Sequence, residues 1–225
     1  MPHQYCMKTT KFIKVAIDGG AGSGKSTTSK LLSEKMRYMH VDTGSHYRLL
    51  THAFLRKGIE LSGIEEALNL NKFKITSTIS GFSAQLVIND LQVPDADLRT
   101  EEINLTVSRF ASHSAIRGFL FDYQRSLVEL AKKENFSGIV MEGRDIGSVI
   151  LPDAELKLYL YADESVRLVR RKADGQSDSI PLRDKMDSGR KNAPLKATSD
   201  SVKIDTGKHS IEDVISLISQ LITNL

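Results

Sequence analysis

The stretch Gly19-Gly20-Ala21-Gly22-Ser23-Gly24-Lys25-Ser26 decides how the rest of this chain is interpreted. It fits the phosphate-binding pattern G-x-x-x-x-G-K-[ST] at every position. Glycines let the backbone turn tightly, so that several N–H groups can point at one triphosphate. In such a loop Lys25 reaches the β- and γ-phosphates and the Ser26 hydroxyl holds Mg²⁺. The stretch, together with Thr27, therefore predicts a nucleoside triphosphate site with Mg²⁺ as the cofactor.

The residues on both sides of this loop have the order that the motif requires. Residues 12–18 are β-rich, and residues 25–36 predict a helix with Leu31, Leu32 and Met36 on one apolar face. A strand, a glycine-rich loop and a helix in succession are the context that supports the motif. We therefore favour a nucleoside triphosphate site over a chance match.

Short β-rich runs alternate with helical runs along the rest of the chain, which predicts a parallel α/β sheet. The predicted strands are 12–18, 38–42, 138–142, 155–161 and 201–205, and the predicted helices are 25–36, 44–57, 163–172 and 210–223. Residues 100–133 predict two more helices with a break near residues 112–114. The expected architecture is a three-layer fold around a central parallel sheet of five strands.

Residues 72–98 interrupt this alternation. Residues 73–76 and 85–88 predict strands, Asn89-Asp90 has the chemistry of a hairpin turn, and residues 91–93 predict a returning strand. We expect a small antiparallel insert in the parallel fold. It is either structural decoration or a mobile flap over a second substrate, and we favour the flap.

The composition narrows the class of protein. The 225 residues carry a net charge of +3, and no Lys/Arg run is long enough to suggest a nucleic-acid-binding arm. The single cysteine, Cys6, excludes an internal disulfide and fits a reducing compartment. No run approaches the roughly 18 apolar residues of a membrane span, and residues 1–11 lack the apolar stretch of a signal peptide. We expect a cytoplasmic monomer that acts on small molecules, without a membrane or nucleic-acid partner.

Three carboxylates, Asp18, Asp42 and Glu142, each end a predicted strand. In parallel α/β sheets, ligands bind beyond these carboxyl ends, so all three are expected to face one crevice. A carboxylate placed there, beside a phosphate loop, often orients Mg²⁺ through water. Ser26 and Glu142 are therefore the predicted metal site.

Several arginines surround the same region of the predicted fold. Arg48 lies one helical turn beyond Gly44, and Arg144-Asp145 follows the strand that ends at Glu142. The sequence positions of Arg183, Asp187 and Arg190 (i, i+4, i+7) predict one helical face, and Arg167, Arg170 and Arg171 lie on another predicted helix. Taken alone, Arg48 and the face of residues 183–190 are better explained by a solvated surface, whereas a purely structural ion pair is the less favoured explanation of Arg144-Asp145. Phosphoryl transfer, however, requires such clusters, because catalysis consists largely of neutralising charge on phosphate oxygens.

Together these motifs resemble bacterial cytidylate kinases, which move the γ-phosphate of ATP to CMP or dCMP. The resemblance covers roughly residues 12–222. Its landmarks, besides the phosphate loop, are Ile17-Asp18-Gly19, Asp42-Thr43-Gly44, Tyr47-Arg48, Leu98-Arg99-Thr100, Gly143-Arg144-Asp145-Ile146-Gly147, Pro152-Asp153-Ala154, Arg183-Asp184, Ala193-Pro194-Leu195 and Ile204-Asp205-Thr206.

The resemblance implies roles for individual residues. The implied catalytic residues are Lys25, Arg170, Arg183 and Arg190. The implied CMP-binding residues are Thr43; Arg48, Arg144 and Arg190 on the phosphate; Arg183 and Asp187 at the ribose and reaction centre; and Ser108, Arg117 and Asp145 on the cytosine. A carboxylate can accept the cytosine N4 proton and an arginine can donate to N3 and O2, whereas uracil reverses the pattern at positions 3 and 4.

The resemblance also implies a division of the chain. Residues 12–71 and 99–225 are expected to form the P-loop kinase core, residues 72–98 the insert that binds the nucleoside monophosphate, and residues 172–182 a short lid. The chain departs from the family in two places. Glu142 stands where the family usually has Asp, and the lid is shorter than usual, which puts its closure over ATP in question.

Other functions remain open on the sequence alone. A kinase with a different small-molecule acceptor, or a nucleotide-binding module with weak turnover, would keep the phosphate loop. A guanine-nucleotide switch is less favoured, because the Asn-Lys-x-Asp pattern fails at residues 71–74 and no Asp-x-x-Gly occurs.

Overall fold

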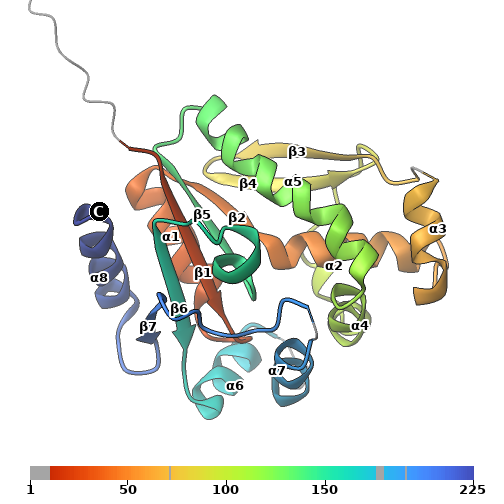
Figure 1. The fold of residues 1–225 in the computed structure, drawn as a ribbon. Coiled ribbons are helices and arrows are strands. Elements are labelled where there is room, and N and C mark those ends of the chain that lie inside the picture. Colours follow the sequence, from red (N-terminus) through yellow and green to blue (C-terminus); the bar gives the residue numbers. More distant parts are fainter. Residues whose placement is uncertain (1–10, 71, 176–179, 191) are drawn as a thin grey trace, which may run out of the picture.

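The computed structural model describes residues 11–70, 72–175, 180–190 and 192–225, and within them a sheet of seven strands crosses the molecule (Figure 1). The strands are β1 (Ile13–Gly19), β2 (Met39–Asp42), β3 (Ile75–Ser80), β4 (Ser83–Ile88), β5 (Gly138–Gly143), β6 (Leu156–Tyr161) and β7 (Val202–Asp205), in the order β3-β4-β2-β5-β1-β6-β7. All neighbouring strands are parallel except β3 and β4. The predicted α/β fold and its five parallel strands are confirmed, but the antiparallel pair extends the same sheet to seven strands.

The predicted hairpin was wrong in its choice of strand partner. Strand β4 pairs with the preceding β3, from Ile75↔Ile88 to Ser80↔Ser83, and Gly81 takes a left-handed φ of 57° in the turn between them. Asn89-Asp90 does form a turn with positive φ, yet Leu91 makes only an isolated bridge to Ile88. A longer return strand is opposed by Pro94, which has no N–H to donate.

The helices of the described residues are α1 (Lys25–Met36), α2 (Thr43–Arg56), α3 (Ile64–Asn69), α4 (Glu101–Ala111), α5 (Ser114–Lys133), α6 (Glu164–Ala173), α7 (Ile180–Ser188) and α8 (Ile211–Thr223), with short 3-10 turns η1 (Leu61–Gly63) and η2 (Asp97–Arg99) and a π turn η3 (Ile146–Ile150). Six of these helices, α1, α2, α4, α5, α6 and α8, lie close to the predicted positions, whereas α3 was not predicted.

Local capping explains where several helices begin. His113 accepts the backbone N–H of Ala115 and starts α5, which confirms the predicted break between α4 and α5. Asp42 caps α2 in the same manner, with its side chain accepting the N–H of Ser45. Over the described ranges, no helix combines the length and the apolar character needed to cross a membrane.

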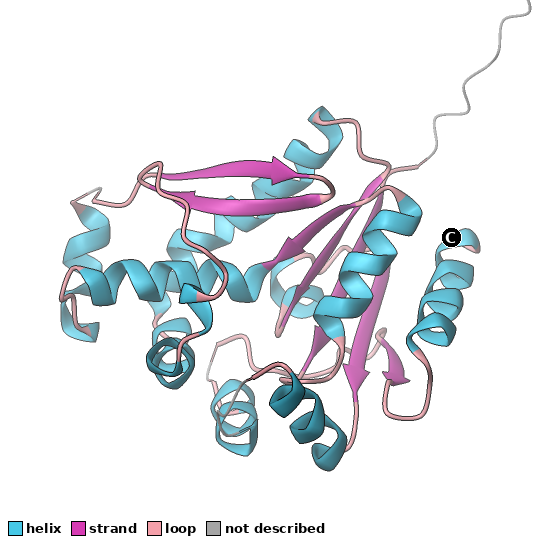
Figure 2. Cartoon of the chain, turned by 180° about the vertical axis from the view of Figure 1, so that it is seen from behind, coloured by secondary structure: helices cyan, strands magenta, loops and turns pink. Residues whose placement is uncertain are grey.

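The two faces of the sheet are covered by different helices (Figures 1 and 2). Alternate residues of β1 point to opposite faces: Val15 and Ile17 join a cluster with Ile218 of α8, whereas Ala16 joins a cluster with Leu127 of α5. All five side chains are at most 1 % exposed, and burial of one large aliphatic side chain contributes about 1.5–3 kcal/mol. The result is the predicted three-layer arrangement.

A third apolar cluster joins the antiparallel pair to the helices. Phe54 of α2 contacts Phe73 and Phe110 at ring distances of 4.9 and 5.9 Å, and Leu86 and Ile88 of β4 belong to the same cluster. Strand β4 is therefore held both by pairing with β2 and by this core. The cluster positions the segment that leads from β4 to α4, which borders the site.

Candidate active site

The phosphate loop lies between β1 and α1, and its backbone shape depends on glycine. Gly22 and Gly24 have left-handed φ values of 71° and 82°. A Cβ at Gly22 would also lie 2.9 Å from the carbonyl oxygen of Arg167, so a side chain does not fit there. The Lys25 Nζ donates to the Gly20 carbonyl at 2.7 Å. Burial, followed by the positive charge of Arg144, lowers the pKa of Lys25 to about 7.

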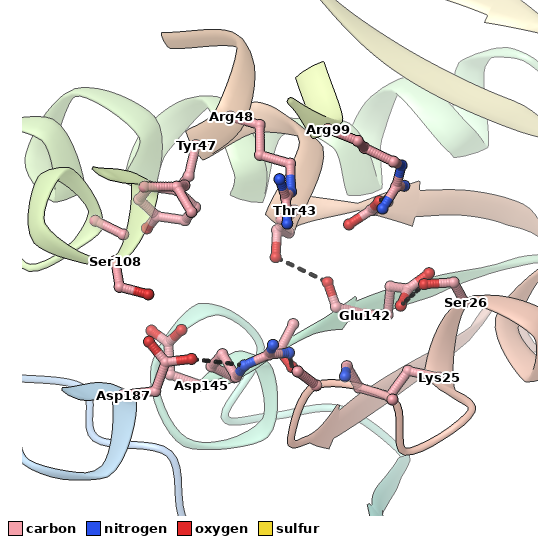
Figure 3. A pocket seen from close by; sticks show the side chains of 18 of the residues that line it. Lys25, Ser26, Thr43, Tyr47, Arg48, Arg99, Ser108, Glu142, Asp145 and Asp187 are labelled. Atoms are coloured by element: carbon pink, nitrogen blue, oxygen red, sulfur yellow. Dashed lines mark hydrogen bonds and ion pairs between the residues drawn. The ribbon is translucent and has the colours of Figure 1, made fainter. Parts of the chain in front are cut away.

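Glu142 connects the phosphate loop to the neighbouring strands (Figure 3). Its Oε2 accepts the Ser26 hydroxyl at 2.9 Å, its Oε1 lies 3.0 Å from His40 Nε2, and its backbone oxygen accepts the Thr43 hydroxyl at 2.8 Å. The side chain of Glu142 is buried, and Asp42 is its register partner on β2.

These groups fit Mg²⁺. Ser26, Glu142 and the adjacent Asp42 offer oxygen atoms, which are the ligands that this hard cation prefers. Within the described residues, no group of three or more His, Cys, Asp or Glu side chains is arranged to hold a metal. Mg²⁺ keeps several waters and takes only one or two carboxylates besides substrate phosphates.

The opposite part of the same cavity carries the residues that the resemblance assigned to cytosine (Figure 3). Ser108 of α4 and Asp145 line it, and Arg117 of α5 pairs with Asp145 through its Nη2. Burial raises the pKa of the Asp145 carboxyl, although the charge of Arg117 acts in the other direction. The Arg117 guanidinium also lies over the ring of Tyr47, 5.8 Å from its centroid.

Between these two ends, the cavity is lined by arginines. Arg48 of α2 is buried, and its Nη1 donates to the Leu98 carbonyl at 3.0 Å and to Asn104 Oδ1 at 2.6 Å. The Arg144 Nε donates to Asp187 Oδ2 at 2.9 Å, and Arg190 donates to the other oxygen of Asp187. Asp187 thus holds two of the predicted phosphate-binding arginines beside one another.

The prediction of one helical face for residues 183, 187 and 190 was wrong at Arg190. Helix α7 ends at Ser188, so Arg190 lies beyond it and reaches the site through its ion pair with Asp187. Arg183 belongs to α7, but its side chain lies outside what the structure describes. The predicted lid, residues 172–182, begins in the last turn of α6 and ends in α7, and residues 176–179 of it also lie outside the described part.

The three arginines of α6 occupy different places. Arg167 pairs with Asp184 and donates to the Ala21 carbonyl of the phosphate loop at 3.2 Å. Arg170, the predicted catalytic residue, donates to the Thr206 carbonyl at 2.7 Å and lines a second cavity. Arg171 lines both cavities. The second cavity is also lined by residues 22–28 of the phosphate loop and α1, Thr27 among them.

Asp18 was wrongly predicted to face the crevice. Its two carboxylate oxygens accept the backbone N–H groups of Ile146 and Gly147, both at 2.8 Å. These N–H groups reach β1 because they are the first of the η3 turn, which follows directly after Asp145. Burial raises the pKa of Asp18 to about 6. Asp18 therefore holds the loop that carries Arg144 and Asp145 and does not line the site.

The structure brings most of the predicted site together. The predicted residues that line the main cavity are Ala21, Gly22, Lys25, Ser26, Thr43, Arg48, Ser108, Glu142, Arg144, Asp145, Asp187 and Arg190. Arg99 was quoted only as a landmark, yet it lines the same cavity and its Nη2 lies 3.9 Å from Asp42 Oδ2. Its place in the landmark Leu98-Arg99-Thr100 was the sequence signal that could have identified it.

Comparisons with known proteins agree on the family. The family model for cytidylate kinase matches residues 15–224. The cytidylate kinase of Bacillus cereus (strain ATCC 10987 / NRS 248) is 34% identical over 226 residues, covering 96% of this chain and 98% of the relative. That of Geobacillus sp. (strain WCH70) is 34% identical over 221 residues, covering 93% and 96%.

Among solved structures, shikimate kinase from Acinetobacter baumannii in complex with shikimate is similar at a TM-score of 0.43 and 14% identity, covering 96% of this chain and 95% of that one. A likeness at that level carries no conclusion about substrates. The family model, by contrast, spans nearly the whole chain, and the curated relatives have the same extent. This chain therefore belongs to the cytidylate kinase family.

Proposed function

We propose that this chain transfers the γ-phosphate of ATP to CMP or dCMP, giving ADP and CDP or dCDP. The observation that carries the proposal is Asp145, which lines the cavity together with Ser108 and Lys25 and which pairs with Arg117 just outside the lining. A carboxylate accepts the N4 amino group of cytosine, and an arginine donates to N3 and O2. Uracil presents a carbonyl at position 4, so two acceptors would face each other in a buried site, which is costly.

The charges between the two ends of the cavity suit two phosphate groups. In the proposed complex, Lys25 and the loop amides bind the β- and γ-phosphates, and Arg48, Arg144 and Arg190 bind the acceptor phosphate. The acceptor oxygen belongs to a phosphate that is already ionised, so the transfer needs no general base. The task of these residues is to align the two groups and to neutralise their charge.

Mg²⁺, when bound at Ser26 and Glu142, supplies further neutralisation of charge on the phosphate oxygens. The second cavity, with Thr27 and Arg170, offers room for the nucleoside of ATP. Residues 72–98 belong to the acceptor side in this proposal, residues 12–71 and 99–225 form the kinase core, and Arg183 acts with the catalytic arginines. We further propose that the enzyme acts as a cytoplasmic monomer on these small molecules alone, in keeping with its modest net charge of +3 and single cysteine.

The test is ADP release from ATP and Mg²⁺ with CMP, dCMP, UMP, AMP or GMP as separate acceptors. CMP and dCMP are expected to have the highest kcat/KM. The isosteric variant Asp145→Asn keeps the size of the side chain but removes its charge, so the CMP/UMP ratio of kcat/KM is expected to fall by about tenfold or more. Asp153→Asn, at a side chain that is 63% exposed, is the matched control. A higher kcat/KM with AMP or GMP than with CMP contradicts the assignment.

A further inference from the structure

His40 lies in the middle of β2 and makes side-chain contacts on both sides. The residue is 3 % exposed. Its Nε2 lies 3.0 Å from Glu142 Oε1 on β5, and its Nδ1 lies 3.2 Å from Ser83 Oγ at the start of β4. The ring therefore connects the antiparallel pair to the carboxylate that accepts the hydroxyl of Ser26.

The chemistry of the partners fixes the direction of these hydrogen bonds. An ionised carboxylate only accepts, so Nε2 carries the proton that is donated to Glu142. In a neutral imidazole the other nitrogen then accepts, and Ser83 Oγ donates to it. Glu142 receives a second donor from Ser26 on its other oxygen. Both carboxylate oxygens are thus oriented before any nucleotide binds.

We propose that His40 is a positioning residue that orients Glu142 toward the metal side of the phosphate loop. The proposal rests on the proposed function, in which Ser26 and Glu142 hold Mg²⁺. The length of the glutamate side chain is part of the arrangement, because one oxygen reaches His40 on β2 while the other reaches Ser26 on α1. A Ser26 hydroxyl that donates its proton to Glu142 keeps its oxygen lone pairs directed away from that carboxylate, as a metal ligand requires.

Two variants of similar size separate positioning from packing. His40→Gln can place an amide N–H near the position of Nε2 and keep the contact with Glu142. His40→Asn is shorter, so it keeps a group near Ser83 but does not reach Glu142. Groups that orient metal ligands typically contribute about 10–100-fold in metal affinity. The two variants are therefore expected to differ in metal affinity and to agree in other properties.

The probe is Mn²⁺, which is titrated into the full chain in the presence of saturating ADP. Electron paramagnetic resonance measures the concentration of free Mn²⁺. No phosphate is transferred to an acceptor in this mixture. His40→Asn is expected to weaken Mn²⁺ binding by about tenfold or more, and His40→Gln by less than about threefold. Binding of ADP in the presence of EDTA and binding of CMP are expected to match the wild type in both variants. Circular dichroism establishes that each variant is folded.

Three results overturn the proposal: wild-type Mn²⁺ affinity in His40→Asn, an equal loss in both variants, or no Mn²⁺ binding by the wild-type complex beyond that of ADP alone. If His40→Asn does not fold, Ser83→Ala takes its place, and an affinity unchanged from the wild type refutes the proposal. The acceptor assay is independent of this titration. A chain that prefers another acceptor but loses Mn²⁺ affinity in His40→Asn refutes the proposed function and supports the role of His40.

Discussion

Histidine 46 predicts a pH dependence of stability that can be worked out from its surroundings. It lies on α2, is 0 % exposed, and neither of its ring nitrogens has a hydrogen-bond partner in the described part of the chain. Its ring packs edge-on against Tyr123 at a centroid distance of 5.4 Å. Because burial disfavours the charged imidazolium, the pKa of His46 falls from its ordinary 6.5 to about 4.

The lowered pKa of His46 sets both the sign and the size of the effect. The unfolded chain takes up a proton at His46 near pH 6.5, whereas the folded chain does so only near pH 4. The contribution to folding stability is therefore fully present above pH 6.5 and is lost as the pH falls toward 4. A pKa difference of about 2.5 at about 1.4 kcal/mol per pH unit gives about 3 kcal/mol over the full window.

Asp18 acts in the opposite sense over much of the same window. Its pKa rises from 3.8 to about 6, so its contribution to stability is present below pH 3.8 and is lost as the pH rises through 6. The difference again corresponds to about 3 kcal/mol. Between pH 4 and 6 the two groups nearly cancel in the wild-type protein, so only a variant reveals either contribution.

The informative variant is His46→Leu, which fills a similar buried volume and cannot titrate. Urea unfolding of the wild type and the variant is measured at pH 7, 6, 5 and 4.5. The difference in free energy of unfolding is expected to shift in favour of the variant by about 2–3 kcal/mol between pH 7 and 4.5. His209→Gln, at an exposed histidine, is the control. A difference that stays constant over this range refutes the argument.

Two further predictions concern the phosphate groups. Lys25→Ala is expected to lower kcat/KM for CMP phosphorylation by at least about 10²-fold, because it removes the only lysine that lines the main cavity in the described structure. Steady-state kinetics at saturating ATP measure this loss, and a loss below tenfold contradicts the prediction. Arg190→Ala is expected to lower kcat/KM by at least about 10²-fold as well, since it removes one of the two arginines held by Asp187. Wild-type kinetics in this variant contradict the phosphate-binding role of Arg190. The control is Lys208→Ala, which removes an exposed cation on the loop after β7.

The sequence predicted the parallel core because its signals are local. The phosphate loop and the break near residue 113 each depend on a few neighbouring residues, and both were confirmed. The apolar face predicted for α1 was wrong at Leu31, which is 40% exposed, whereas Leu32 is fully buried. The antiparallel insert was predicted, but the returning strand at residues 91–93 was wrong, because Asn89-Asp90 has strong turn chemistry. Pairing of β4 with β3 depends on burial of Leu86 and Ile88 against distant helices. A local turn signal does not reveal which neighbouring strand buries more apolar surface.

The candidate site shows the same division. Motifs could assign Glu142 to the strand end, but its contact with His40 joins residues 102 positions apart and has no sequence signature. Asp18 and Arg99 illustrate the related difficulty of side-chain direction. A residue at a strand end can point into the crevice or toward a neighbouring loop, and only the η3 turn decides this for Asp18. Arg190 reached the site without the helix predicted to carry it.

The buried carboxylate of Asp18 has a consequence for how two substrates meet. It immediately precedes Gly19 of the phosphate loop, and it binds the two amides that follow Asp145. The strand that leads into the phosphate loop and the loop that carries Arg144 and Asp145 therefore share one joint, made of two hydrogen bonds to a single side chain. In the proposed complex, where these segments hold donor and acceptor, their relative placement is set when the chain folds, so nucleotide binding does not have to supply the entropy of aligning them.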